Sequence, residues 1–294
     1  MWAGHFFVYN GLVETRRLGR TEHQSSLAIL GGAAFAQCTS EEAERGFSEA
    51  VARGVNHLDI APRYGAAQDL VGPFVPAVRD KLFVACKTTR RNADGVRAQL
   101  EESLTKLGCD SFDLYQMHAV TDLDVLEERT AAAEEILRAR DEGLVRFAGI
   151  TGHNDGAPAA HLEALKRFDL DTVMFPVNAR MWSQASYRAD AEALLELCAA
   201  RDVGVMAIKA AARKPWASDD RFATTWYEPW PDPSAGIAFT LSVPGVHAFC
   251  TPGDLALTRE AITAAEAFVP LDDEAWNAAI SEAAPLASIF PLGG

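Results

Sequence analysis

Long hydrophobic runs are missing from this 294-residue sequence. No stretch approaches the roughly 18 consecutive apolar residues that a membrane-spanning helix requires. The opening segment, residues 1–13, is apolar, but no basic region precedes it and no A-x-A cleavage site follows it, so we do not expect a secretory signal peptide. The protein is therefore predicted to act away from membranes.

Cysteine is scarce, with only five residues in the chain. Their number is odd, their spacing is wide, and none of them forms a C-x-x-C pair of the kind that holds a metal or performs redox chemistry. They stand at Cys38, Cys86, Cys109, Cys198 and Cys250. We expect reduced thiols, a cytoplasmic location and no metal site.

Positively charged residues are also few. The chain has 27 Lys and Arg residues against 41 Asp and Glu residues, which gives a net charge of −14. Such a surface repels nucleic-acid backbones and anionic membranes over most of the molecule. A nucleic-acid partner is not expected, although a local basic pocket for a small molecule remains compatible with this balance.

What the sequence does have is a regular alternation of short apolar runs with longer segments of helical periodicity, between about residues 27 and 267. The predicted strands lie at 26–32, 55–60, 81–87, 111–118, 145–151, 171–177, 204–210 and 246–250. The predicted helices lie at 40–54, 68–80, 92–108, 127–143, 158–168, 188–204, 234–242 and 255–268. The first of these helices has Ser40 as its expected N-cap and Gly54 as its terminal residue.

Eight strand and helix pairs of this length predict the α/β class and a (β/α)8 TIM barrel, with an open doubly wound sheet as the alternative. Residues 5–19 predict a β-hairpin around Asn10–Gly11 that covers the barrel floor, and residues 272–284 predict an additional C-terminal helix. No linker, repeat or low-complexity tract interrupts the chain, so residues 1–294 are predicted to form one domain.

Four polar residues follow the second, third and fourth predicted strands, namely Asp59, Tyr64, Lys87 and His118. A phenol is a poor acid at neutral pH, but a neighbouring ammonium such as Lys87 favours the phenolate and lowers its pKa. Asp59 could hold that lysine charged, while His118 could orient a substrate carbonyl. Together the four residues predict protonation of a carbonyl oxygen, which is reductase chemistry.

Each of these residues alone has an ordinary structural explanation. An Asp after a strand is commonly a helix cap, a Tyr is commonly a half-buried aromatic, and a His is commonly a satisfied core residue. Lys87 is harder to explain in this way, since a charge at the end of a buried strand needs a partner. The prediction therefore depends on the set rather than on any member.

The sequence resembles the aldo-keto reductase family in four segments, RRLGRT at 16–21, DIAPRYG at 59–65, CKT at 86–88 and QMH at 116–118. The resemblance covers about residues 16–267. It implies that Tyr64 is the proton donor, that Lys87 and Asp59 tune it, and that His118 positions the carbonyl of an aldehyde or ketone.

The resemblance also implies a nicotinamide cofactor that lies extended across the barrel mouth, NADPH with NADH possible, and neither a metal nor a G-x-G-x-x-G motif. The cofactor contacts that it implies are Gly32, Thr151, Asn178, Lys209 and Thr251. Members are often monomers, so we expect a monomer or a small homo-oligomer.

The chain departs from the family pattern on the cofactor side. Gly152 stands where an Asn usually holds the carboxamide, Met174 replaces a Gln, and Lys209 replaces a stacking aromatic. Ala256 aligns with the usual Arg, which leaves the choice between NADPH and NADH open, although Arg259 is nearby. For Lys209 two roles remain open, a contact with the cofactor pyrophosphate and a strand-end lysine that reaches solvent.

Two alternatives to a reductase remain, the first suggested by these departures and the second by a desolvated lysine at a strand end. One is a regulatory subunit that binds the nicotinamide nucleotide without turnover, and the other is a Schiff-base lyase with Lys87 as the nucleophile. For a reductase, the four aromatic residues after the sixth and seventh strands favour an apolar or aromatic carbonyl substrate. They are Trp182, Trp226, Tyr227 and Trp230.

Overall fold

Eight parallel strands close into a barrel in the computed structural model, which describes residues 11–290. The strands are β3 (Ala28–Gly31), β4 (His57–Asp59), β5 (Phe83–Thr88), β6 (Phe112–Met117), β7 (Val145–Thr151), β8 (Thr172–Pro176), β9 (Gly204–Ile208) and β12 (Ala248–Cys250). They follow chain order around the barrel, and β12 closes it by pairing with both β9 and β3. The predicted (β/α)8 barrel is confirmed, and the open sheet is excluded.

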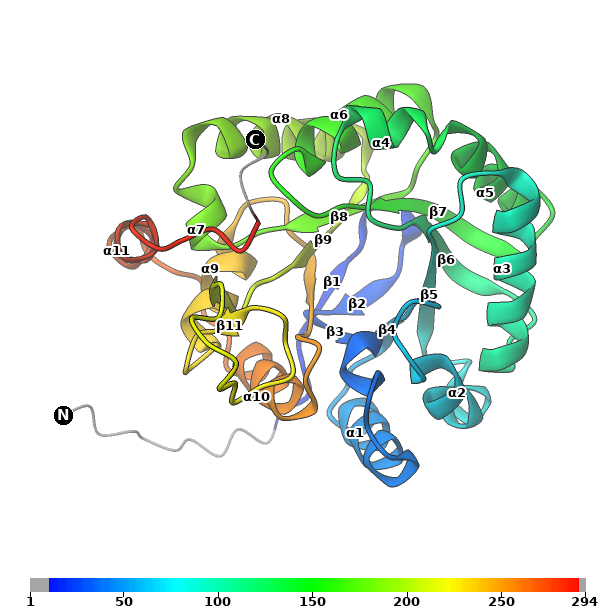
Figure 1. The fold of residues 1–294 in the computed structure, drawn as a ribbon, viewed down its shortest axis with the longest axis horizontal. Coiled ribbons are helices and arrows are strands. Elements are labelled where there is room, and N and C mark those ends of the chain that lie inside the picture. Colours follow the sequence, from blue (N-terminus) through cyan, green and yellow to red (C-terminus); the bar gives the residue numbers. More distant parts are fainter. Residues whose placement is uncertain (1–10, 291–294) are drawn as a thin grey trace.

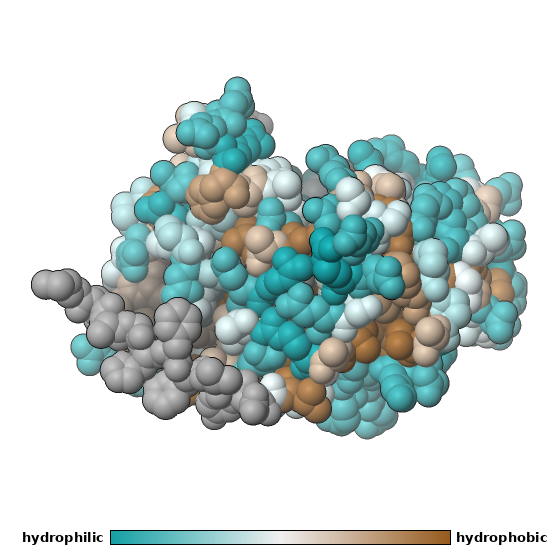
Figure 2. Space-filling model, turned by 90° about the horizontal axis from the view of Figure 1, so that it is seen from below, coloured by the Kyte–Doolittle hydropathy of each residue, from teal (hydrophilic) through white to brown (hydrophobic). Residues whose placement is uncertain are grey.

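Helices surround this barrel as an outer ring (Figure 1). They are α1 (Ser40–Ala52), α2 (Ala67–Val71), α3 (Ala93–Leu107), α4 (Leu123–Glu127), α5 (Thr130–Asp141), α6 (Ala157–Arg167), α7 (Ala179–Trp182), α8 (Ala185–Arg201), α9 (Ser234–Ser242), α10 (Leu255–Glu266) and α11 (Asp273–Ala283). Helix α11 is the predicted C-terminal helix. On the face seen in Figure 2, hydrophilic residues predominate and hydrophobic residues form small separate groups, as expected where helices turn their apolar sides inward.

Two helix predictions need correction. Thr39, not Ser40, is the N-cap of α1, because its hydroxyl accepts from the Glu42 backbone N–H at 3.2 Å while the Glu42 carboxylate accepts from the Thr39 N–H at 2.8 Å. The helix predicted at 68–80 is broken after Val71 into two 3-10 turns, Gly72–Phe74 and Pro76–Val78. Each turn carries a proline near its start, where a continuous helix would need a backbone N–H.

A hairpin covers the barrel floor, but it is not the one predicted around Asn10–Gly11, because residues 15–17 pair with a segment that follows them. Strand β1 (Thr15–Arg17) pairs antiparallel with β2 (Gln24–Ser26), and the connection contains a 3-10 turn at Gly19–Thr21. The first arm of the predicted hairpin, residues 5–9, and its turn residue Asn10 lie outside the described residues. Since the Arg20 N–H donates to the Asp202 carbonyl just before β9, the turn sits at the N-terminal ends of the strands.

The interior of the barrel is filled with side chains. Leu18, from the floor hairpin, is fully buried there. It belongs to a cluster whose other buried members are Ile29, Phe83, Ala85, Leu114, Met174, Met206, Ile208 and Ala248. A filled interior leaves the mouth, at the C-terminal ends of the strands, as the place for a site.

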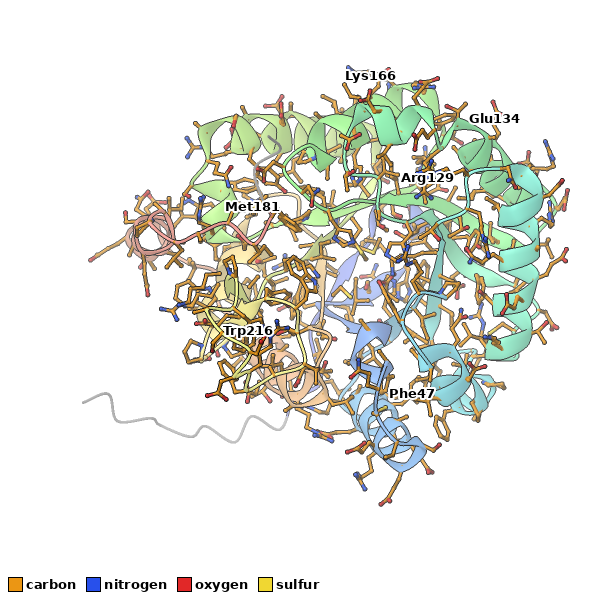
Figure 3. The ribbon with its side chains drawn as sticks, in the orientation of Figure 1. Phe47, Arg129, Glu134, Lys166, Met181 and Trp216 are labelled. Carbon is orange, nitrogen blue, oxygen red and sulfur yellow. The ribbon has the colours of Figure 1, made fainter. Side chains whose placement is uncertain are left out.

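A long loop between β9 and α9 lies at this mouth. It contains a small antiparallel sheet of β10 (Ala212–Lys214) and β11 (Glu228–Pro229), and Trp216 stands in the segment that joins them (Figure 3). The Trp216 indole donates to the Thr225 carbonyl at 2.8 Å, and Thr224 donates to Asp254 ahead of α10. The loop is therefore ordered by its own aromatics and tied to the neighbouring connection between β12 and α10.

No helix within residues 11–290 combines the length and the apolar character that a membrane span requires.

Candidate active site

The structure brings the four predicted catalytic residues together at the barrel mouth. Asp59 is the last residue of β4, Lys87 lies near the end of β5, His118 follows β6, and Tyr64 stands in the loop after β4. The Lys87 ammonium forms an ion pair with the Asp59 carboxylate and also lies 3.3 Å from the Tyr64 hydroxyl oxygen. Parallel strands end at one edge, which is why residues distant in sequence meet here.

Asp59 has further partners that the sequence did not reveal. The Gln116 amide donates to Asp59 Oδ1 at 3.2 Å, and Cys250 Sγ lies 3.8 Å from Oδ2. Gln116 is completely buried and lies on β6, within the QMH segment that ends in His118. A polar residue within a barrel strand was the available signal, since strand positions in a barrel interior are usually apolar.

His118 stands edge-on to Tyr64, with 5.7 Å between the ring centroids. Burial, reinforced by the positive charge of Lys87, holds the pKa of His118 well below its usual value. The ring is therefore neutral at pH 7 and carries one N–H donor. A neutral donor beside Tyr64 suits the predicted role of orienting a carbonyl oxygen.

The expected lowering of the Tyr64 pKa does not occur. Burial raises the pKa of Tyr64 to about 12, and the Lys87 ammonium only partly opposes this. For Lys87, desolvation disfavours the charge, but Asp59 outweighs it and raises the pKa of the lysine above its ordinary value. At neutral pH the protein thus holds a protonated phenol next to a protonated lysine, which is the state that can give a proton away.

Tyr64, Lys87 and His118 line a cavity of about 60 Å³ that shares several residues with a groove of about 670 Å³. Three of the predicted cofactor contacts line the cavity as well, Thr151 at the end of β7, Lys209 after β9 and Thr251 after β12. Thr251 also accepts from the Gly31 N–H at 2.9 Å, which joins the last strand to the first.

Gly32 and Asn178, the other two predicted cofactor contacts, do not line this cavity. A Cβ at Gly32 would lie 2.7 Å from Ile60, so close packing explains the glycine, and its neighbour Gly31 lines the cavity instead. The Asn178 amide accepts from the Met181 N–H at 2.9 Å and donates to the Lys209 carbonyl at 3.2 Å. Both side-chain groups of Asn178 are thus already engaged within the protein.

Lys209 turns into the cavity rather than toward bulk solvent. Its ammonium lies 5.2 Å from the Trp226 ring centroid and 5.3 Å from that of Tyr227. Its backbone φ is +65°, which a residue with a side chain rarely adopts. Burial lowers the pKa of Lys209 to about 8.

Two of the four predicted pocket aromatics reach this region, because Trp226 lines the groove and Tyr227 lines both the groove and the cavity. Trp182 is buried in the core instead, and Trp230 packs against Arg213.

His153 is a cavity residue that the sequence reasoning missed. It stands two residues after β7, 6.1 Å from the His118 ring, and lines both the cavity and the groove. Burial lowers the pKa of His153 to about 3, so it too is neutral at pH 7. Its position just beyond Thr151, at another strand end, was the signal that could have identified it.

The groove has features that fit a dinucleotide. It runs from the cavity to the N-terminal end of α10, where Leu255 and Ala256 line it and the helix dipole favours phosphate. Arg45 and Arg259 supply positive charge along it, although Arg45 is paired with Glu41 at 2.6 Å and Arg259 with Glu49 at 2.7 Å. A cavity with donors for a carbonyl oxygen, open to a groove with donors for phosphate, is the arrangement that a nicotinamide cofactor needs.

Comparison with known proteins agrees with this fold. Residues 28–215 match the model of the aldo/keto reductase family. An aldo-keto reductase from Bacillus halodurans, solved in its holo form, superposes with a TM-score of 0.72 at 20% identity, over 95% of this chain and 98% of that one. A thermostable aldo-keto reductase solved with the inhibitor epalrestat gives 0.69 at 23% identity, over 91% and 98%. At these identities the two structures support the fold alone.

Curated relatives match over shorter segments. An uncharacterized oxidoreductase of Bacillus subtilis is 29% identical over 178 residues, which is 54% of each chain. L-Galactose dehydrogenase of Arabidopsis thaliana is 30% identical over 157 residues, 48% of this chain and 49% of that one. The chain spans about half the length of the curated relatives it matches.

Proposed function

Because the chain belongs to the aldo/keto reductase family and is thus an oxidoreductase, we propose that it reduces an aldehyde or ketone to an alcohol with hydride from NADPH or NADH. The observation that carries the proposal is the contact between Tyr64 and Lys87. The ion-paired Lys87 ammonium lies 3.3 Å from a phenol that faces a cavity open to a groove.

Each of the four residues has a defined task in this reaction. When bound, the cofactor supplies the hydride that adds to the carbonyl carbon. Tyr64 donates its proton to the carbonyl oxygen, and the Lys87 ammonium stabilises the phenolate that remains. Asp59 keeps Lys87 protonated, while His118 donates a hydrogen bond that positions the carbonyl oxygen.

Cofactor contacts are proposed at residues on the cavity wall. Thr151 and Thr251 supply hydroxyl groups there, and Lys209 supplies a positive charge. The proposed contacts at Gly32 and Asn178 rest on the family resemblance alone, and the choice between NADPH and NADH stays open. The proposed substrate is an apolar or aromatic carbonyl compound, since Trp226 and Tyr227 line the approach to Tyr64.

The Schiff-base alternative is not favoured by this geometry. An amine must lose its proton before it can attack a carbonyl, and the Asp59 charge holds Lys87 protonated.

A Tyr64→Phe variant tests the proposal. Loss of the proton donor should lower kcat by about 10²–10⁴-fold, while cofactor binding stays close to that of the wild type. Tyr115→Phe is the matched control. It removes the hydroxyl of a buried tyrosine of β6 that packs in the hydrophobic core and does not line the cavity. The measurement is cofactor oxidation with a panel of aliphatic and aromatic aldehydes and ketones.

Unchanged turnover in Tyr64→Phe would contradict the assignment of the proton donor. Tight cofactor binding by the wild type, with no turnover of any carbonyl compound in the panel, would instead favour the regulatory subunit.

A further inference from the structure

The cavity carries one uncompensated positive charge. Lys87 is neutralised by Asp59, and the lowered pKa values of His118 and His153 keep both rings neutral at pH 7. Lys209 is different, because within residues 11–290 no carboxylate oxygen lies within 4 Å of its ammonium. The other titratable groups that act on it are Lys87 and Cys250, and burial keeps the Cys250 thiol protonated by raising its pKa to about 12.

Lys209 is also held in place. Its backbone has the left-handed φ of +65°, and its carbonyl accepts from the Asn178 amide at 3.2 Å. The Trp226 and Tyr227 rings flank the ammonium on the side of the long loop. A strained backbone and two aromatic neighbours fix a cation that would otherwise turn toward water.

The Lys209 ammonium therefore lies in the part of the cavity that the nicotinamide ring of a bound cofactor would have to occupy. In the proposed function, a carbonyl oxygen that accepts from Tyr64 places its carbon in this cavity, and hydride transfer requires the nicotinamide ring in contact with that carbon. The oxidised ring bears a positive charge and the reduced ring is neutral, whereas the rest of the cofactor is the same in both forms. Only the oxidised form is repelled by Lys209.

We propose that Lys209 makes this site discriminate between the two redox states of its cofactor, binding the reduced nicotinamide nucleotide more tightly than the oxidised one. The inference rests on the proposed function and adds a task to Lys209. Repulsion of the oxidised ring speeds release of the spent cofactor after each turnover, and it limits inhibition by that product. A pyrophosphate contact alone would strengthen binding of both forms by the same factor.

The test is a comparison of dissociation constants for NADPH and NADP⁺, measured by fluorescence titration at pH 7 for wild type, Lys209→Met and Lys209→Arg. We expect the ratio of the NADP⁺ constant to the NADPH constant to fall by about tenfold or more in Lys209→Met, because like charges repel more strongly in a partly buried site than in bulk water. Lys209→Arg should keep most of the ratio. Lys214→Met is the control, since Lys214 pairs with Glu228 outside the cavity.

Equal weakening of both cofactor forms in Lys209→Met would overturn the proposal in favour of a pyrophosphate contact. If that variant does not fold, the pH dependence decides, because the wild-type ratio should fall as the pH rises above the pKa of Lys209 while the Lys209→Arg ratio stays constant. A wild-type ratio that does not change with pH would then overturn it. Failure of the wild type to bind either form would instead overturn the proposed function itself.

Discussion

At the scale of single residues, the site depends on how Asp59 is held. Two charged groups are buried side by side, and such a pair is stable only when its remaining polar atoms find partners. Lys87 and Cys250 lie against Oδ2 of the carboxylate, while Gln116 donates to Oδ1. We therefore regard Gln116 as a positioning residue that fixes which oxygen faces the lysine.

Replacing Gln116 by Leu should leave Asp59 Oδ1 without its donor. We expect the free energy of unfolding to fall by about 1–3 kcal/mol. We also expect kcat to fall more than KM changes, and the pH profile of kcat to shift, because the carboxylate that keeps Lys87 protonated is disturbed. The measurements are chemical denaturation and a pH series of kcat.

Gln99→Leu is the matched control for that variant. Gln99 is also a buried glutamine, and it accepts from Thr88 at 2.7 Å on the helix side of β5, away from Asp59. A similar loss of stability with unchanged kcat is expected. If both variants shift the pH profile of kcat by the same amount, Gln116 is not a positioning residue.

The sequence could identify the four catalytic candidates because Asp59, Lys87 and His118 are polar residues at the ends of apolar runs. Tyr64 stands in the loop that follows the first of these runs. The sequence also shows a polar residue within a strand at Gln116 and a histidine just beyond a strand end at His153, but whether these side chains face the site depends on barrel geometry. The pKa of Tyr64 shows the same limit. The neighbouring Lys87 was predictable, but the degree of burial that outweighs it was not.

At the scale of elements, strand positions were predicted best, and helix ends and short helices worst. Strand β7 and helix α9 have the predicted bounds, because a strand between turns and a helix after a proline both have clear signals. Helices α4 and α7 were missed, since one turn of helix shows no periodicity. The prolines that break residues 68–80 were visible, but the periodicity of the apolar residues masked them.

The corrected cap of α1 gives a prediction at this scale. Thr39→Ala removes the hydroxyl that caps the helix and should lower the free energy of unfolding by about 1 kcal/mol. Ser40→Ala, one residue further on, should change it very little. Thermal or urea denaturation of the two variants decides, and the reverse order would restore Ser40 as the cap.

At the scale of the whole molecule, the barrel is closed at the N-terminal ends of its strands and open at their C-terminal ends. The floor hairpin inserts Leu18 between the strand starts, and the long loop with Trp216 and Trp226 borders the mouth. Eight alternating pairs were enough to predict this architecture. Oligomeric state, cellular location and the extent of the domain, residues 1–294, stay predictions.

Leu18→Ala should leave a cavity in the barrel interior and lower the free energy of unfolding by about 2–5 kcal/mol. Leu12→Ala is the control, because Leu12 is 72% exposed and should contribute little. Equal midpoints in urea for the two variants would show that the hairpin does not seal the floor.

The central claim is that this barrel delivers a hydride and the Tyr64 proton to one carbonyl group. The most direct measurement is a single-turnover experiment, in which protein saturated with NADPH is mixed with an aldehyde and both cofactor oxidation and alcohol formation are followed. We predict one alcohol formed for each cofactor oxidised by the wild type, and a rate about 10²–10⁴-fold lower in Tyr64→Phe. Oxidation without alcohol, or equal rates in the two proteins, would contradict the account.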